Sequence, residues 1–224
     1  MRKLLIITFL ASQPLFGQTA SSTSGNENIR DLAADDNTMT VRTFDNRYAG
    51  VKGHPYLIED WTAGSLTTID GKKYQNVELK YDLNRDEVVI RKKGTSQIIA
   101  LFNEKVESFS LQDRHFVMIG SEDGNRFYEK LVDGENVLLA HRKKKLLKAD
   151  YEGAYSGGRT QDEFLNPSSD YFAWKDKNLV KLKPNAKSIA LAYGISDKEV
   201  KQKVKAFKLL LKEEDHLVKL ISGL

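Results

Sequence analysis

The sequence contains no cysteine. This absence excludes disulfide bonds, thiol catalysis and cysteine-based metal sites. It also excludes the lipid-modified cysteine that anchors exported bacterial lipoproteins. The folded chain must therefore be held together by its hydrophobic core alone.

Catalytic and cofactor motifs are scarce as well. The four histidines, His54, His115, His141 and His216, do not form HExxH or any other paired spacing, so the sequence does not indicate a zinc site. A glycine loop with a lysine for phosphate and a dinucleotide fingerprint are both missing. The segment "GAYSG" places its serine wrongly for a nucleophile elbow. These absences predict a protein that is not an enzyme and has no cofactor.

Long hydrophobic runs are missing too, apart from one short run near the start. Arg2 and Lys3 precede the apolar segment "LLIITFLA", and the small residues Gly17 and Ala20 follow it. The run is too short for a bilayer, which needs about 20 apolar residues. This order is typical of a secretory signal peptide. We predict a signal peptide over residues 1–17, cleaved after Gly17 or Ala20, and a mature chain without a transmembrane span.

Net charge is small, at +4 for the whole chain. Removal of the signal peptide takes away Arg2 and Lys3 and leaves +2. That excess is too small to indicate nucleic-acid binding. The first part of the mature chain is acidic and the last is rich in lysine, but solvated helix faces produce the same asymmetry.

Composition divides the mature chain into three parts. Residues 18–40 are rich in Ser, Thr, Gly, Asn and Asp, and we predict that this polar lead is disordered because it has too little apolar surface to bury. Residues 41–182 carry turn signals about every ten residues, with short Val-, Ile-, Phe- and Tyr-rich segments between them. Residues 183–224 have helical periodicity.

The middle part is predicted to be mainly β. In "VELKYDL", Val77, Leu79 and Tyr81 alternate with polar residues, as in a strand with one buried face. Asp-Gly pairs between such segments, for example Asp133-Gly134, are typical of hairpins. Short strands at this spacing indicate an antiparallel β meander, either barrel-like or a curled sheet. The helical part would form a C-terminal cap on it.

Three helices are predicted in that cap. The first covers Ala186–Tyr193 and ends at Gly194. Ser196 and Glu199 have the spacing of a capping box at the start of the second. An apolar face at helical spacing is formed by Val200, Val204, Phe207 and Leu211. The third helix covers about residues 213–222.

A weak calcium candidate lies in the segment "DLNRDE". Asp82, Asn84 and Asp86 stand at alternate positions, as oxygen ligands do in a calcium loop. The sixth position of that loop must be glycine, and here it is Glu87. A hairpin turn explains these residues better.

A basic run and a long loop supply the predicted partner-binding residues. The run begins at Arg142, and in a strand Arg142 and Lys144 would share one face. Lys143 and Lys145 would face the other side, which weakens a nucleic-acid interpretation. The following loop holds Tyr151, Tyr155 and Arg159, which are residue types enriched at interfaces. Its length favours a functional role, although the two tyrosines could instead cover the edge of the sheet.

Three segments, "YAGVKGHPYLIEDWTAGSL", "YQNVELKYDLNRDEVVIR" and "KKKLLKADYEGAYSGG", stand out along the chain. They resemble segments of exported β-rich proteins of the Bacteroidetes type, a set with no established activity. The first contains a G-x-P-Y-L-x-x-x-W segment formed by Gly53, Pro55, Tyr56, Leu57 and Trp61. The resemblance covers most of Tyr48–Leu224. It implies export, a Gram-negative envelope setting and this order of the fold, but no catalytic residue.

Three functions are compatible with these observations. We favour an exported envelope or secreted protein, not an enzyme, that binds another protein or a cell-surface component. One alternative is a carrier of a lipid or small molecule inside the β domain. Another is a hydrolase of glycans or peptides. The expected location is the periplasm, the outer membrane or the exterior.

Overall fold

The computed structural model describes residues 39–41, 47–91, 98–121, 124–150 and 157–224. The predicted signal peptide and most of the predicted polar lead therefore lie outside the described residues. Met39 and Thr40, the end of that lead, belong to a strand that pairs with residues 99–101. The β domain thus begins slightly earlier than the predicted boundary at residue 41.

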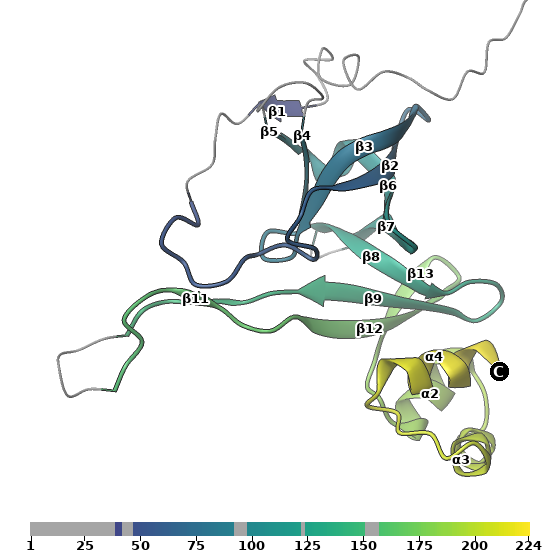
Figure 1. The fold of residues 1–224 in the computed structure, drawn as a ribbon. Helices are drawn as coiled ribbons and strands as arrows, with labels where there is room; N and C mark the ends of the chain where they lie inside the picture. Colours follow the sequence, from purple (N-terminus) through teal and green to yellow (C-terminus); the bar gives the residue numbers. More distant parts are fainter. Residues whose placement is uncertain (1–38, 42–46, 92–97, 122–123, 151–156) are drawn as a thin grey trace, which may run out of the picture.

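One antiparallel sheet dominates the described part of the chain (Figure 1). It contains eleven strands in the order β1-β5-β4-β3-β2-β6-β7-β8-β9-β12-β13, and it is curled without closing into a barrel. The strands are β1 (Met39–Val41), β2 (Thr62–Thr68), β3 (Lys73–Asp82), β4 (Glu87–Arg91), β5 (Ile98–Leu101), β6 (Val106–Leu111), β7 (Arg114–Ser121), β8 (Gly124–Val132), β9 (Val137–Lys143), β12 (Ser168–Lys175) and β13 (Asn178–Leu182). The prediction of a mainly β meander with a helical C-terminus is confirmed.

Side-chain alternation explains where these strands lie. In β3, Val77, Leu79 and Tyr81 are buried on one face, as the pattern "VELKYDL" predicts. The turn of the β12–β13 hairpin is formed by Asp176 and Lys177, which both have positive φ. Such a turn matches the right-handed twist of the two strands.

The curled half of the sheet encloses an aromatic core. It runs from β5 through β4, β3, β2, β6 and β7 to the first part of β8. The rings of Phe109 and Phe116 stack with centroids 4.7 Å apart. Tyr81 meets both rings edge-on, and Phe127 meets that of Phe109. All four side chains are buried. Packed side chains therefore fill the interior of this half.

A second core lies between the sheet and three helices. These are α2 (Ala186–Tyr193), α3 (Asp197–Ala206) and α4 (Glu214–Ser222). They lie together beside β9 and β12 (Figure 1) and bury Leu217, Leu220 and Ile221 of α4 in a cluster with Leu138 and Ala173 of the sheet. None of the helices in the described ranges is both long and apolar enough to cross a bilayer.

The helix ends agree with the sequence pattern in most respects. Gly194, in the left-handed conformation with φ 70°, ends α2 as predicted. Ser196 caps α3, but its side chain accepts the N–H of Lys198 at 3.2 Å, so the bond falls one residue before the predicted Glu199. Phe207 departs from the predicted apolar face and is 59% exposed, because α3 ends at Ala206 and the chain turns away there.

The turn between β3 and β4 lies between β8 and β9 at the place where these two strands stop pairing. We call this place the seam. Pairing of β8 with β9 stops at Glu129 opposite Ala140. Beyond that point the N–H of Phe127 donates to the Asp86 carboxylate, at 3.3 Å to Oδ2. On the other side Lys144 N–H donates to the carbonyl of Leu83 at 3.2 Å. The turn thus bridges the two strands where the curled half leaves the rest of the sheet.

A strap formed by residues 47–57 crosses the end of β3. Leu57 N–H donates to the Tyr81 carbonyl at 2.9 Å, and Leu83 N–H donates to Pro55 at 3.0 Å. Lys80 lies over the rings of Tyr56 and Trp61, at 4.6 and 5.0 Å from their centroids. The G-x-P-Y-L-x-x-x-W segment therefore attaches the strap to the curled half.

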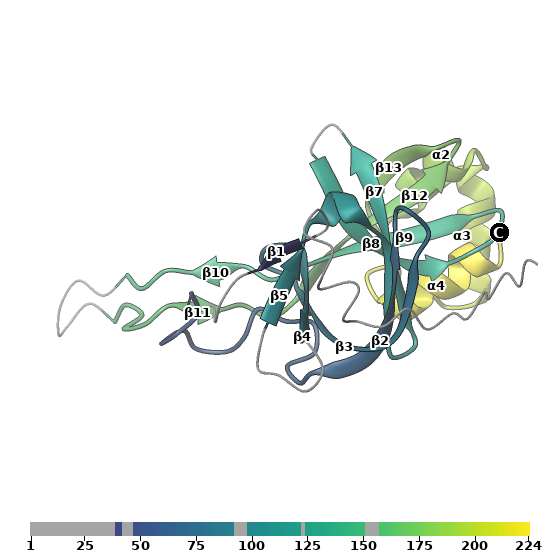
Figure 2. The same cartoon turned by 90° about the horizontal axis from the view of Figure 1, so that it is seen from above.

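A two-stranded arm extends from the body of the molecule (Figure 2). Its strands are β10 (Leu146–Leu147) and β11 (Glu163–Phe164). The sequence predicted a loop over residues 151–166, which contains β11, and a strand from Asn136 through the basic run that precedes β10. Strands of two residues are too short to show an alternating pattern of their own. The backbone of Lys52 joins the arm through hydrogen bonds with Asp162 and Phe164, at 2.8 and 3.0 Å.

We predict that Leu79→Ala lowers the free energy of unfolding by about 2–5 kcal/mol, because it leaves a cavity in the core of the curled half. Leu79 is 0% exposed. The matched control is Leu191→Ala in α2, where Leu191 is 83% exposed and the change should stay within about 0.5 kcal/mol. Urea unfolding measures both, and equal effects would contradict this assignment of the core.

Candidate functional site

A groove on the sheet face opposite the helices combines aromatic and basic side chains. Its volume is about 670 Å³, within the range of about 300–1,000 Å³ that is usual for ligand sites. The lining residues are Gly120, Ser121, Arg126, Tyr128, His141, Lys143, Asp170, Phe172, Trp174, Lys177, Asn178, Leu179 and Lys181. We call it the basic-aromatic groove.

Strand alternation gives the groove its residues. On β12, Asp170, Phe172 and Trp174 line the groove, while Tyr171 and Ala173 between them pack in the helical core. Because successive side chains of a strand point to opposite faces, one strand serves both surfaces. The neighbouring strand β9 presents His141 directly opposite Asp170.

Aromatic rings brace one another in the groove. Tyr128 meets Phe172 edge-on, with ring centroids 5.3 Å apart and planes at 86°. The ring of Tyr128 also lies 5.7 Å from that of His141. Tyr128 is buried, whereas Phe172 and Trp174 are half-buried. The rings are thus fixed by packing yet partly accessible to a ligand.

Positive charge dominates the rim. Arg126, Lys143, Lys177 and Lys181 line the groove together with one carboxylate, that of Asp170. Lys143 and Lys181 lie 2.5 and 3.3 Å from Asp170 Oδ2. Burial raises the pKa of Asp170, but the hydrogen bonds from these two lysines outweigh it, so the pKa lies below its usual value. Asp170 is therefore ionised at neutral pH and holds two of the four cations in place.

Lys177 occupies an unfavourable backbone conformation. Its φ is +63°, and the preceding Asp176 has φ +51°. Glycine or asparagine is preferred where such a turn needs positive φ, and another residue there costs about 1–2 kcal/mol. Backbone strain of this kind is concentrated at functional sites. The strained turn places an exposed lysine on the rim of the groove.

His141 connects the groove with the seam of the fold. Its side chain is 9% exposed, and its Nε2 lies 3.7 Å from Oδ2 of Asp86. That distance is too long for a hydrogen bond, and Nε2 is buried without a hydrogen-bond partner. The same Asp86 carboxylate accepts the Tyr81 hydroxyl and the Phe127 N–H. One buried carboxylate thus lies next to both the aromatic core and a groove residue.

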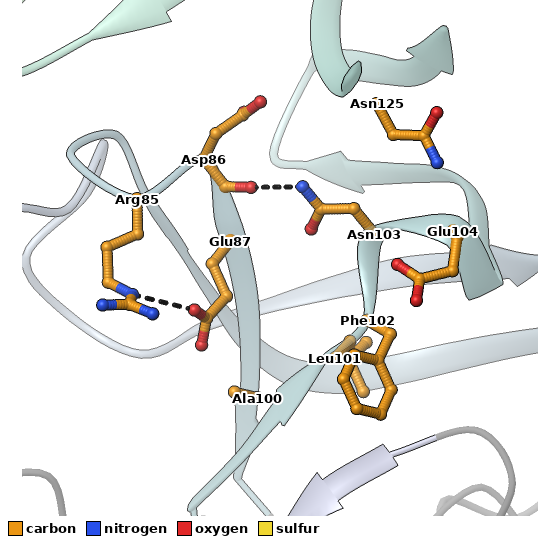
Figure 3. A pocket seen from close by; sticks show the side chains of 9 residues that line it. All are labelled: Arg85, Asp86, Glu87, Ala100, Leu101, Phe102, Asn103, Glu104 and Asn125. Carbon is orange, nitrogen blue, oxygen red and sulfur yellow. Dashed lines mark hydrogen bonds and ion pairs between the residues drawn. The ribbon is translucent and has the colours of Figure 1, made fainter. Parts of the chain in front are cut away.

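A second cavity, of about 360 Å³, lies near the β3–β4 turn (Figure 3). Four of the polar residues that line it are already engaged in pairs. Arg85 Nε lies 3.0 Å from Glu87 Oε2, and the Asn103 amide donates to the Asp86 carbonyl at 2.7 Å. This cavity therefore offers fewer groups to a ligand than the basic-aromatic groove does.

The calcium candidate residues lie at the same turn. Asp82 Oδ1 accepts the N–H groups of Asn84 and Arg85 at 2.9 and 3.0 Å, and its Oδ2 accepts the Tyr48 hydroxyl at 2.8 Å. Burial raises the pKa of Asp82. The Asn84 amide donates to Lys144, and Asp86 is used as described above. Calcium would have to compete with these hydrogen bonds, and among the described residues no group of three or more His, Asp or Glu side chains is arranged to hold a metal.

Arg142, a predicted partner-binding residue, connects the sheet to the helices. Its guanidinium lies 2.5 Å from Glu129 on β8 and 2.5 Å from Glu214 on α4. Tyr171 also donates to Glu214, at 2.8 Å, and Arg114 lies 2.5 Å from Glu129. Arg142 is buried, so its described contacts are internal.

Two further predicted partner-binding residues, Lys144 and Arg159, lie apart from Arg142. Strand β9 ends at Lys143, and the ammonium of Lys144 donates to the strap, at 2.8 Å to the His54 carbonyl. Arg159 lies in the arm, where its guanidinium pairs with Asp150. Tyr151 and Tyr155 lie outside the described residues. Arg142, Lys144 and Arg159 thus belong to three different parts of the fold, and Arg142 and Lys144 do not form the common face expected of a continuous strand.

Comparisons with protein families, curated proteins and solved structures find no match to this chain. The function of the chain must therefore be inferred from its residues and their geometry.

Sequence inspection missed the groove residues, although a signal for them exists. In "SSDYFAWKDKNLVKL", Asp170, Phe172 and Trp174 alternate, and a two-residue turn brings Leu179 and Lys181 beside them. When aromatic and charged residues share one face of a hairpin, that face is partly exposed and is not buried in a hydrophobic core. Tyr128 and His141 come from β8 and β9, and the sequence does not show that these strands lie beside β12.

We predict that Glu214→Gln lowers the free energy of unfolding at pH 7 by about 1–3 kcal/mol, because Arg142 loses a charged hydrogen-bond partner. Burial raises the pKa of Glu214, but Arg142 and Tyr171 together lower it below its usual value. The contribution of this carboxylate is therefore present above its unfolded-state pKa and is lost as pH falls through the folded-state pKa.

Denaturant unfolding at pH 7 and at about pH 3 checks this prediction. The gap between wild type and Glu214→Gln should shrink at the lower pH. Glu135→Gln, in the exposed turn before β9, serves as the control and should stay within about 0.5 kcal/mol. A gap that is constant with pH would contradict the assignment.

Proposed function

We propose that this protein is an exported binding protein, not an enzyme, that attaches to an anionic component of the cell surface through the basic-aromatic groove. The observation that carries the proposal is the composition of the groove. Four cations and one carboxylate line it together with Tyr128, Phe172 and Trp174. A concave surface with this charge attracts anions, and aromatic walls add apolar contact area.

Electrostatics favour an anionic partner over a neutral one. Asp170 neutralises part of the charge of Lys143 and Lys181, but among the described residues of the lining four cations stand against one carboxylate. A cleft focuses such a field and raises the local concentration of anions. Because the rim is exposed, salt should weaken the attraction.

Two further observations support this proposal over its alternatives. Side chains such as Tyr81, Phe109, Phe116 and Phe127 fill the curled half, which weighs against a carrier with a ligand inside the β domain. The signal-like N-terminus, with Arg2 and Lys3 before its apolar run, supports export and therefore access to envelope components.

We predict that Lys177→Gly weakens binding and stabilises the fold at once. Glycine removes the cation from the rim and accepts the positive φ of the turn, which should raise the free energy of unfolding by about 1 kcal/mol. Lys177→Gly alone should reduce co-sedimentation with envelopes of the source cells at low salt, and Lys177→Gly/Lys181→Gln should reduce it several-fold. A binding loss that accompanies a stability gain cannot result from unfolding.

The matched control is Lys187→Gln/Lys198→Gln, which removes the same charge from exposed positions on α2 and α3. It should bind envelopes like the wild type. Envelope binding that is unchanged in Lys177→Gly/Lys181→Gln, or that is insensitive to salt, would exclude the groove as the attachment site.

A further inference from the structure

The basic-aromatic groove presents three kinds of chemistry at once: cations, an ionised acceptor and aromatic rings. We infer that its ligand is an acidic oligosaccharide, a chain of sugar units that carries carboxylate or phosphate groups. This inference rests on the proposed function and narrows the anionic component to one chemical class.

The rings supply the contact that sugar units need. A pyranose ring presents a face of C–H groups, and the negative face of an aromatic ring attracts their weakly positive hydrogens. Phe172 and Trp174 stand on the same side of β12 and are half-buried. Tyr128 holds Phe172 edge-on at 5.3 Å. Rings that are fixed in this way lose little entropy when a sugar stacks on them.

Asp170 favours the binding of sugars over that of simple anions. A carboxylate in a basic groove repels every anion, and only a ligand that also carries hydrogen-bond donors can offset this repulsion. Sugar hydroxyls are donors, and an ionised carboxylate accepts hydrogen bonds from them strongly. Lys143 and Lys181 hold the Asp170 oxygen and lower the pKa of this group. The groove therefore suits a ligand that carries hydroxyl donors as well as negative charge.

The size of the groove indicates a chain of sugars and not a single one. A smaller cavity of about 360 Å³ lies on the same face, and Trp174 lines both. The other residues that line this smaller cavity are Val117, Ile119, Lys130, Asp133, Val137 and Leu139. An extended ligand could therefore contact Trp174 and continue along the strands in either direction.

The test uses the mature chain with Trp61→Phe, which leaves Trp174 as the single tryptophan of the two in the sequence. Hexagalacturonate is titrated against it, with neutral cellohexaose and an end-blocked hexaglutamate of equal charge as comparison probes. We expect hexagalacturonate to bind most tightly and to change the emission of Trp174. In the original Trp61 background, calorimetry of Trp174→Ala should show binding weakened by roughly tenfold.

Asp170→Asn tests the hydroxyl contact separately. It removes a repulsive charge, so hexaglutamate should bind more tightly, while the preference for hexagalacturonate over hexaglutamate should fall several-fold. Lys187→Gln is the control and should leave the affinity for both probes unchanged. Thermal melting verifies that each variant is folded.

Each remaining outcome counts against the inference. Equal affinity for hexaglutamate and hexagalacturonate, with Trp174→Ala like wild type, would indicate an acidic peptide segment and overturn the glycan assignment. Failure of every probe to bind would overturn it as well. The proposed function is judged separately, by the envelope co-sedimentation of Lys177→Gly/Lys181→Gln, so the two failures are distinguishable.

Discussion

The buried carboxylate of Glu129 is the interaction on which the two halves of this molecule depend. It lies on β8, the strand that both halves share, and its side chain is only 7% exposed. Arg114 reaches it from the curled half, and Arg142 reaches it from β9 and extends to Glu214 on α4. A buried charge is tolerated only when it is paired and hydrogen-bonded. The positions of β7, β9 and α4 relative to β8 are therefore fixed together, because a shift of any one would leave a charge unpaired.

This arrangement also decides which surface remains available for binding. Phe127 and Glu129 stand on the same face of β8, one in the aromatic core and the other in the ionic network. That face of the sheet thus contributes to both cores. The part of it that the curled half does not enclose is covered by the helices. On the opposite face, Tyr128 and Phe172 are left to form a groove. The groove is a consequence of how the sheet distributes its buried residues, and it needs no separate structural element.

Sequence pattern was sufficient for many of the elements but not for the seam. Helix α2 was predicted at the bounds it has, Ala186–Tyr193, because helical periodicity and a terminal glycine carry their own signal. The role of Asp86 was hidden, since its partner, the Phe127 N–H, lies 41 residues away and backbone donors leave no trace in a sequence. The role of Arg142 was hidden for a similar reason. A basic run suggests a surface, and only the sheet order reveals that Glu129 and Glu214 surround this residue.

His141 lies between the seam and the groove. His141 packs against Tyr128 on the groove side, and its Nε2 lies next to the carboxylate of Asp86. Asp86 is in turn fixed by the Tyr81 hydroxyl and the Phe127 N–H. The ring of Tyr128 thus packs on a histidine that lies beside a carboxylate held in place by the core of the curled half. A ligand that stacks on these rings meets a surface ordered by folding, so little of its binding energy is spent on arranging the protein.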